Sequence, residues 1–256
     1  MRRTIVAVAA VAVAAAIAAI VAVTLTAGGR PSGPGPAWPN SANPSKAASP
    51  VALRLGFVTD IPQAPALVGL REGLFASALR GTGIVLRPVP FRTDAAEATA
   101  LASGQLDAAY ASTGSILADL ASPHGTRIAV MSGASAGNSP ANLVVTRAFL
   151  SAHSASVLAV VKGQVQANDL LNHDQLAASA AYTAELTSLT GQRLPASSAG
   201  ESLARTRFTD DPGATSLTAS VPASLSSEVR PALPTLYDIA PLNLLLRMVG
   251  ERPVAS

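Results

Sequence analysis

The residues with the clearest chemical potential are the five at positions 133–137, Gly-Ala-Ser-Ala-Gly. Their spacing matches Gly-x-Ser-x-Gly, the pattern that places a serine nucleophile on a tight strand-to-helix turn in α/β-hydrolases. Ser135 would be that nucleophile. A strand-like run precedes it at 127–131, but Pro140 and a second strand-like run follow in place of a helix. The pattern therefore lacks the element that would present the serine.

A hydrolase of this type also needs an acid and then a histidine after its serine. The chain has three histidines, His124, His153 and His173. Only the last two follow Ser135, and both lie in polar segments with helical spacing. We therefore predict that the protein is not an enzyme, and we interpret residues 133–137 as a binding loop.

The composition gives little support for metal, cofactor or nucleic-acid binding. There is no cysteine, and the histidines and carboxylates form no cluster with ligand spacing, so we expect neither a metal nor a cofactor. Asp210 and Asp211 precede Pro212 and are typical of a helix cap and turn. The chain carries a net charge of +3 without a Lys/Arg run or a basic-aromatic stripe, which argues against a nucleic-acid partner.

A second group of polar residues follows the predicted strands. It comprises Thr59 and Asp60 after one strand, Ser112, Thr113 and Gly114 after another, and Ser132 and Ser135 after a third. In an open parallel α/β sheet the carboxyl ends of the strands line one edge, where ligands bind. The middle group opens a helix, whose first N–H groups can hold a small anion. The same residues would also serve as a plain helix cap, and both readings remain open.

The elements that must position these residues alternate along the chain. Apolar runs predict strands, and 3.6-residue spacing predicts helices between them. The strands are expected at 51–58, 84–91, 106–111, 127–132 and 141–145, and the helices at 64–79 (broken near Gly73), 93–104 and 112–121. This order predicts an α/β fold with a largely parallel sheet of about five strands flanked by helices. The last hundred residues read as helical, without strands.

The N-terminal region differs from the rest. Met1-Arg2-Arg3 is followed by uncharged residues 4–27, long enough to span a bilayer, for which about 20 residues suffice. Residues 1–27 therefore predict either a cleaved signal peptide or a membrane anchor, and either would export the rest of the chain. Residues 28–50 are rich in Pro, Gly and Ser and predict a disordered tether. The folded domain is expected at 51–256.

Several segments together resemble a known family. These are LRLGFVTDIPQAPALVGLREGLFASAL, AEATALASGQLDAAYASTGSILADLA and RIAVMSGASAG, followed later by LVVTRAFLSAHSASVLAVVKGQVQANDLLN and LYDIAPLNLLL. In order, they resemble the solute-binding proteins of ABC importers, of the nitrate/sulfonate/taurine type. The resemblance implies a type II periplasmic binding protein-like fold outside the cytoplasm. It also implies a small anionic solute, such as an aliphatic sulfonate, taurine or nitrate, and an ABC permease as partner.

The resemblance assigns roles to the polar residues. Ser112, Thr113 and Ser135 would donate hydrogen bonds to the anionic head group of the solute. Asp60 and Gln63 would meet an amine or another polar tail. Thr59, Gly114 and Ser132 would complete the site.

Two departures from the family pattern are visible. Gln63 stands where the family has a histidine. The Leu143-Val144-Val145 strand occurs only once, so the second lobe of the family is missing and a single lobe is expected. A two-lobed receptor buries its ligand by hinge closure, and one lobe leaves it open to water. The alternative is therefore a membrane-tethered interaction protein, or a relic of such a receptor that binds no solute.

Overall fold

The computed structural model describes residues 50–122, 127–137, 139–215, 217–221, 223 and 229–254. The predicted leader, nearly all of the predicted tether and His124 lie outside these residues. The division of the chain into leader, tether and folded domain therefore stays a prediction.

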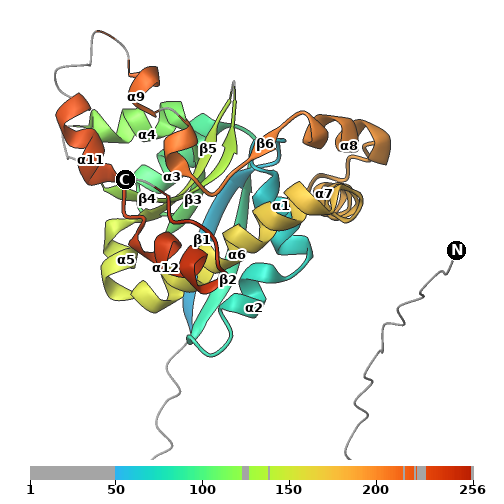
Figure 1. The fold of residues 1–256 in the computed structure, drawn as a ribbon, viewed down its shortest axis with the longest axis horizontal. Helices are drawn as coiled ribbons and strands as arrows, with labels where there is room; N and C mark the ends of the chain where they lie inside the picture. The colour runs from blue at the N-terminus through green and yellow to red at the C-terminus, as the bar shows by residue number, and fades with distance from the viewer. Residues whose placement is uncertain are drawn as a thin grey trace, which may run out of the picture. The chain divides into compact units, whose positions relative to one another are not determined.

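The described residues form one sheet with the strand order β2-β1-β3-β5-β4-β6 (Figure 1). The strands are β1 (Val51–Val58), β2 (Ile84–Phe91), β3 (Ala108–Ser112), β4 (Ile128–Ala136), β5 (Ala141–Thr146) and β6 (Arg207–Phe208). β1 pairs with β2 and β3 in parallel, whereas β5 is antiparallel to both β3 and β4. The strands β1 to β4 consequently run in one direction, and their carboxyl ends lie at one edge.

Helices cover both faces of the sheet (Figure 1). One face is covered by α1 (Ala64–Arg71), α2 (Leu74–Ala78), α5 (Arg147–Ala152), α6 (Ser154–His173), α7 (Gln175–Thr190), α8 (Ala196–Ala204) and α12 (Ala240–Met248). The other face is covered by α3 (Asp94–Ala102), α4 (Thr113–Leu120), α9 (Leu217–Ser220) and α11 (Leu233–Leu236). Two short 3-10 helices, η1 (Pro212–Thr215) and η3 (Arg230–Ala232), complete the described elements. The predicted α/β fold with helices on both faces is confirmed.

The strand sequences explain this three-layer arrangement. Successive side chains of a strand point to opposite faces, so a strand covered on both sides is apolar throughout. In β3, Ala108 and Tyr110 pack into one core and Ala109 and Ala111 into the other. The two cores are therefore supplied by alternate residues of the same short strand.

Local signals place the helix ends where the sequence predicts them. Gly73 adopts a left-handed conformation (φ 65°) and separates α1 from α2. Thr93 is the N-cap of α3, and its side chain accepts a hydrogen bond from the backbone N–H of Ala96. Such a cap satisfies one of the helix N–H groups that have no partner inside the helix.

Two predictions about the chain after residue 131 were wrong. Residues 133–136 belong to β4 and do not form a loop, because pairing with β5 continues past two register shifts. The last hundred residues also contain a strand, since β6 pairs with Ser135 and Ala136 on the open side of β4. Ser and Gly residues in an irregular strand carry no apolar alternation, so the sequence pattern resembles that of a loop.

No helix within the described ranges is long and apolar enough to cross a membrane. The predicted anchor at residues 4–27 lies outside the described residues.

Candidate functional site

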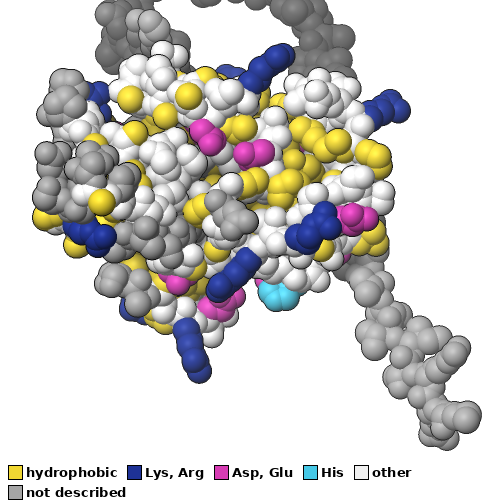
Figure 2. Space-filling view, turned by 90° about the horizontal axis from the view of Figure 1, so that it is seen from above, with side chains coloured by type: hydrophobic (Ala, Val, Ile, Leu, Met, Phe, Trp, Pro, Cys, Tyr) yellow, Lys and Arg dark blue, Asp and Glu magenta, His cyan; other side chains and the backbone are white. Residues whose placement is uncertain are grey.

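The carboxyl ends of β1, β3 and β4 carry the residues expected to bind a ligand. These strands run upward in Figure 1, so Figure 2, seen from above, looks onto this edge. It shows two acidic side chains close together near the middle, with Lys and Arg side chains mainly towards the periphery. The edge thus combines the predicted hydroxyl groups with carboxyl groups.

The turn after β1 is held by Gln63. Its Oε1 accepts a hydrogen bond from the N–H of Val58 (2.6 Å), and its Nε2 donates to Oδ1 of Asp94 (3.3 Å). The backbone N–H of Gln63 donates to Oδ1 of Asp60 (3.1 Å). Gln63 is only 1% exposed, whereas Thr59 and Asp60 are half-buried. Gln63 therefore ties β1 to α3, and of these three residues only Thr59 and Asp60 are open to a ligand.

Sequence reasoning missed two carboxyl groups beside this turn, Asp94 and Glu97. Their spacing, Asp-x-x-Glu, resembles a helix-start motif, but Glu97 points inward and is 1% exposed. No hydrogen bond reaches either of its carboxyl oxygens from the described residues. The available signal was that Glu97 shares a helix face with Ala100 and Leu101, which are buried. A charged residue on an apolar helix face deserves a functional or structural explanation.

Burial shifts the protonation of this acidic group. The pKa of Glu97 is raised to about 8, first by burial and then by the nearby carboxylate of Asp94. The adjacent Tyr110 N–H and Gln63 amide oppose this rise without cancelling it. Burial, with Asp94 again adding to the rise, brings the pKa of Asp60 to about 6. At neutral pH, Glu97 is accordingly mostly protonated and Asp60 mostly ionised.

The start of α4 has the geometry of the predicted cradle. Ser112 is the N-cap, and its Oγ accepts a hydrogen bond from Ser115 N (3.3 Å). Gly114 is exposed, and a Cβ atom there would meet nothing nearer than Ser112 Oγ at 3.9 Å. Thr113 is buried, and its Oγ1 has no partner among the described residues. The cap interpretation holds for Ser112, while the open space beside Gly114 leaves room for a ligand.

The hydroxyl groups of the two serines of β4 make hydrogen bonds within the fold. Ser132 is fully buried, and its Oγ donates to the carbonyl oxygens of Gly133 (3.0 Å) and Asp210 (3.3 Å). Ser135 is 1% exposed, and its Oγ accepts a hydrogen bond from Ala141 N (3.2 Å). Ser112 and Ser135 both pair with Ala141, from opposite sides of β5. They therefore lie two strands apart, on the order of 10 Å.

A buried polar network lies behind these serines. Tyr110 donates to Oε1 of Gln164, whose Nε2 donates to the carbonyl oxygen of Gly133 (2.9 Å). Asn168 donates to Oδ1 of Asp210 (2.7 Å). Burial raises the pKa of Asp210 to about 7, although the Asn168 bond favours its charged form. Asp210 therefore links its own segment to α6 and does not cap a helix. Asp211 makes the predicted turn, because its Oδ1 accepts a hydrogen bond from Gly213 N (2.8 Å).

One cavity at this edge includes a predicted residue. It measures about 520 Å³ and lies between the turn after β1, the end of β4 and α8. Its polar lining consists of Ser135, Ser139, Ser202, Arg205 and Thr206, and Ile61 and Pro62 form an apolar wall. Arg205 is exposed and lies 3.9 Å from Glu201, too far for a strong ion pair. The cavity therefore offers one available cation surrounded by hydroxyl groups, and Arg205 was not predicted.

The arrangement does not suit a serine nucleophile. Ser135 is buried inside a strand, and no histidine in the described part of the chain is bonded to it. The ring of His153 packs against Phe149, and His173 pairs with Asp169 (2.8 Å). The described residues likewise hold no group of three His, Cys, Asp or Glu that could bind a metal ion.

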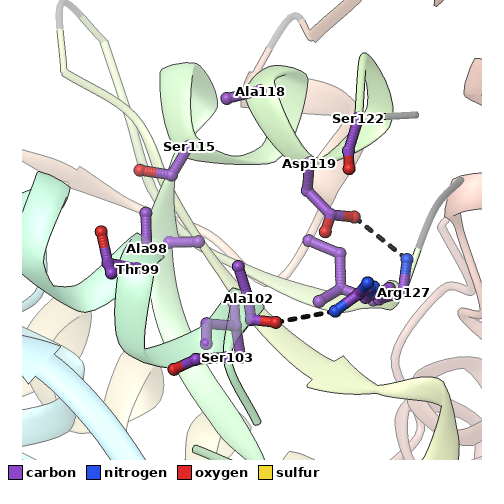
Figure 3. A pocket seen from close by; sticks show the side chains of 12 residues that line it. Ala98, Thr99, Ala102, Ser103, Ser115, Ala118, Asp119, Ser122 and Arg127 are labelled. Carbon is purple, nitrogen blue, oxygen red and sulfur yellow. Dashed lines mark hydrogen bonds between the residues drawn. The ribbon is translucent and has the colours of Figure 1, made fainter. Parts of the chain in front are cut away.

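A second cavity of about 570 Å³ lies away from this edge, between α3 and α4 (Figure 3). Small side chains form most of its wall, and Arg127 spans one end. Arg127 donates from Nη1 to the carbonyl oxygen of Ala102 (2.8 Å) and from its backbone N–H to Oδ2 of Asp119 (3.2 Å). None of the predicted ligand residues lines it. Ser115, whose backbone N–H donates to Ser112 Oγ, does line it.

The fold is that of one lobe of a periplasmic binding protein, of the type found in ABC-transporter substrate-binding proteins for sulfonates. No protein-family model matches the sequence, and a search of curated proteins finds no match. Among the comparisons, the likeness is therefore supported by the solved structures alone.

Three solved structures illustrate the likeness. The alkanesulfonate-binding protein SsuA from Xanthomonas axonopodis pv. citri, bound to MOPS, gives a TM-score of 0.55 at 13% identity, over 76% of this chain and 100% of that chain. The periplasmic aliphatic sulphonate-binding protein SsuA from Escherichia coli gives 0.51 at 12%, over 80% and 90%. The CA3427 gene product of Candida albicans, with the generic periplasmic binding protein fold, gives 0.55 at 12%, over 73% and 96%. At such identities the likeness establishes the fold alone.

Proposed function

We propose that this chain is the extracytoplasmic solute-binding component of an ABC importer and has no enzymatic activity. The observation that carries the proposal is the cavity of about 520 Å³ at the carboxyl edge, with Arg205 among hydroxyl groups. The edge of an α/β sheet where the parallel strands end is the usual place for a ligand. An ABC permease would be the partner that receives the solute.

The chemistry of the cavity favours a small anion. A guanidinium group binds the oxygens of a sulfonate in a bidentate manner, and hydroxyl groups donate further hydrogen bonds. Arg205 would hold the head group, with Ser202 and Thr206 beside it. The N-terminus of α4, with Ser112, Thr113 and Gly114, would be the other donor on this edge.

The acidic side chains favour a solute that also carries a positive group. Asp60 directly precedes Ile61, which lines the cavity, and Asp60 is mostly ionised at neutral pH. An aminoalkanesulfonate such as taurine would place an ammonium group towards Asp60 and its sulfonate towards Arg205. A plain alkanesulfonate or nitrate would leave Asp60 unpaired and is expected to bind more weakly.

A second candidate function is a membrane-tethered interaction protein, or a relic, that binds no solute. This function is favoured because the side chains of Gln63, Ser132 and Ser135 make hydrogen bonds to other parts of the protein. A single lobe also leaves the solute in contact with water, where each hydrogen bond contributes only about 0.5–1.5 kcal/mol. Few such bonds offset the entropy lost on binding.

Calorimetric titration of the full-length chain with taurine, ethanesulfonate, nitrate and sulfate tests the proposal. We expect taurine to bind most tightly, and Arg205→Gln to weaken binding by at least tenfold. Arg193→Gln, which removes an exposed arginine outside the cavity, is the matched control. Absence of binding by all four solutes to a chain that melts cooperatively would favour the second candidate.

A further inference from the structure

A third cavity, of about 460 Å³, lies at the opposite edge of the sheet from the proposed solute site. It lies beside Arg54 in β1, where β3 and β4 begin and where the antiparallel β5 ends and α5 starts. Three arginines from three separate elements line it: Arg54 of β1, Arg127 before β4, and Arg147 at the start of α5. Such a convergence of guanidinium groups is distinct from a run of basic residues along one helix.

The charges in this cavity do not balance. Asp107 is the one carboxylate in its described lining, and Arg54 neutralises it through two hydrogen bonds of 2.8 Å and 2.7 Å. Arg127 and Arg147 are the two other cations of the lining. Asp119 is the other nearby acid; it accepts from the backbone of Arg127 and lines the neighbouring cavity shown in Figure 3. With Asp119 counted, three arginines face two carboxylates, so one positive charge is in excess.

The guanidinium groups of Arg127 and Arg147 belong to exposed residues, and each makes one hydrogen bond to a backbone carbonyl oxygen. Arg127 donates from Nη1 to the carbonyl oxygen of Ala102 at the end of α3 (2.8 Å; Figure 3), and Arg147 donates from Nη2 to the carbonyl oxygen of Thr235. An arginine has five N–H donors, and each of these bonds uses one. The remaining donors make no hydrogen bond within the described residues. Anchoring lowers the entropy that a ligand must overcome to order the side chains.

We propose that this cavity binds a phosphate monoester. The oxygens of a tetrahedral phosphate can accept bidentate hydrogen bonds from two guanidinium groups, and the excess positive charge favours an anion. The cavity has room beyond the phosphate, and the apolar side chains of Leu101, Leu106 and Phe149 line the rest of it. The organic part of the ligand is therefore small and largely apolar. The phosphate group could belong to a soluble metabolite or to the head group of phosphatidic acid, which share this chemistry.

The test uses the full-length chain and two kinds of probe. Phenyl phosphate and inorganic phosphate are titrated calorimetrically at low salt, and binding to phosphatidylcholine vesicles is compared with and without phosphatidic acid. We expect phenyl phosphate to bind more tightly than inorganic phosphate if the ligand is soluble. Retention only on vesicles containing phosphatidic acid would assign the site to the lipid head group.

Variants decide whether the cavity is responsible. Arg127→Gln and Arg147→Gln are each expected to weaken phosphate binding at least tenfold, and Arg147→Lys less than Arg147→Gln. Arg193→Gln is the control for net charge. Because Arg127 also caps α3, Arg147→Gln decides the matter if Arg127→Gln does not fold.

Failure of every phosphate probe to bind, or binding unchanged in Arg147→Gln, would overturn the proposal. Arg205→Gln should leave phosphate binding intact, which separates this site from the proposed solute site.

Discussion

The carboxyl group of Glu97 lies directly over Gly56, so closely that a Cβ atom on this glycine would stand 3.2 Å from Glu97 Oε1. The same Cβ atom would collide with Leu106 Cδ1 at 2.4 Å. The missing side chain in β1 thus provides the space in which α3 buries an acid. The burial of Glu97 in α3 thus depends on the glycine at position 56 in β1, two residues that local sequence patterns treat separately.

The stability of the protein should fall as the pH rises, because of Glu97. Its pKa is raised from 4.5 to about 8 on folding, so the folded state binds the proton more tightly. The stabilisation is fully present below about pH 4.5 and is lost as the pH rises towards 8. Glu97→Gln should flatten this dependence, with a gain on the order of a few kcal/mol near pH 8. Urea denaturation at pH 5, 6.5 and 8 measures it.

The exposed Glu72→Gln is the matched control for that experiment, since it removes a carboxylate from the surface. It should leave the slope of stability against pH unchanged. A smaller slope remains in Glu97→Gln, because the pKa values of Asp60 and Asp210 are also raised on folding. A slope as steep as that of the unsubstituted protein would show that Glu97 is ionised in the folded protein, contrary to its burial.

Gln63 should be essential to the turn rather than to the ligand. Gln63→Leu removes the acceptor of the buried Val58 N–H and the donor to Asp94, and an unsatisfied buried group costs about 1–3 kcal/mol. We expect a loss of stability in this range by urea denaturation. Gln175→Leu, on an exposed helix start, should cost much less. An equal effect of the two substitutions would contradict the role of Gln63.

The packing of Phe75 makes a helix-favouring substitution harmful. A Cβ atom on Gly163 of α6 would lie 2.5 Å from Phe75 Cδ1, and one on Gly69 of α1 would lie 2.3 Å from Phe75 Cε2. Ala is favoured over Gly in a helix by about 1 kcal/mol, but overpacking costs about 1–3 kcal/mol. Gly163→Ala should therefore lower the melting temperature.

Gly114→Ala provides the comparison for Gly163→Ala, because the same substitution in α4 meets no atom nearer than 3.9 Å. It should leave the melting temperature unchanged or raise it. A melting temperature raised by Gly163→Ala as well would mean that Phe75 moves aside without cost.

The sequence predicts the fold better than the site, for physical reasons. Strands buried on both faces and helices with clear caps, such as α3 at Thr93, are encoded by neighbouring residues. The antiparallel insertion of β5 between β3 and β4 depends on pairing between distant segments, which local patterns do not specify. The continuation of β4 through residues 133–136 was missed because its pairing includes irregular positions.

The candidate site depends even more on distant contacts. Ser112 was predicted as a cap from its position before a helix, and the structure agrees. Arg205 lies about seventy residues after Ser135 in the chain, yet both line one cavity. Glu97 fitted a local helix-start motif. Only the space left by the missing side chain of Gly56 shows how it is buried. Residues whose role arises from three-dimensional packing leave a weak local signal.

The bond between Asn168 and Asp210 should matter most at high pH. Folding raises the pKa of Asp210 from 3.8 to about 7, so its carboxyl group is protonated at pH 5 and largely ionised at pH 8. A hydrogen bond to a charged group contributes about 1.5–3 kcal/mol, against about 0.5–1.5 kcal/mol for a neutral pair. Asn168→Ala should therefore lower the free energy of unfolding more at pH 8 than at pH 5, as measured by urea denaturation. Asn172→Ala, one helical turn further along α6, removes a bond to the neutral carbonyl oxygen of Phe208 (3.3 Å) and should cost the same at both pH values. If Asn168→Ala also cost the same at both, Asp210 would not titrate in this range.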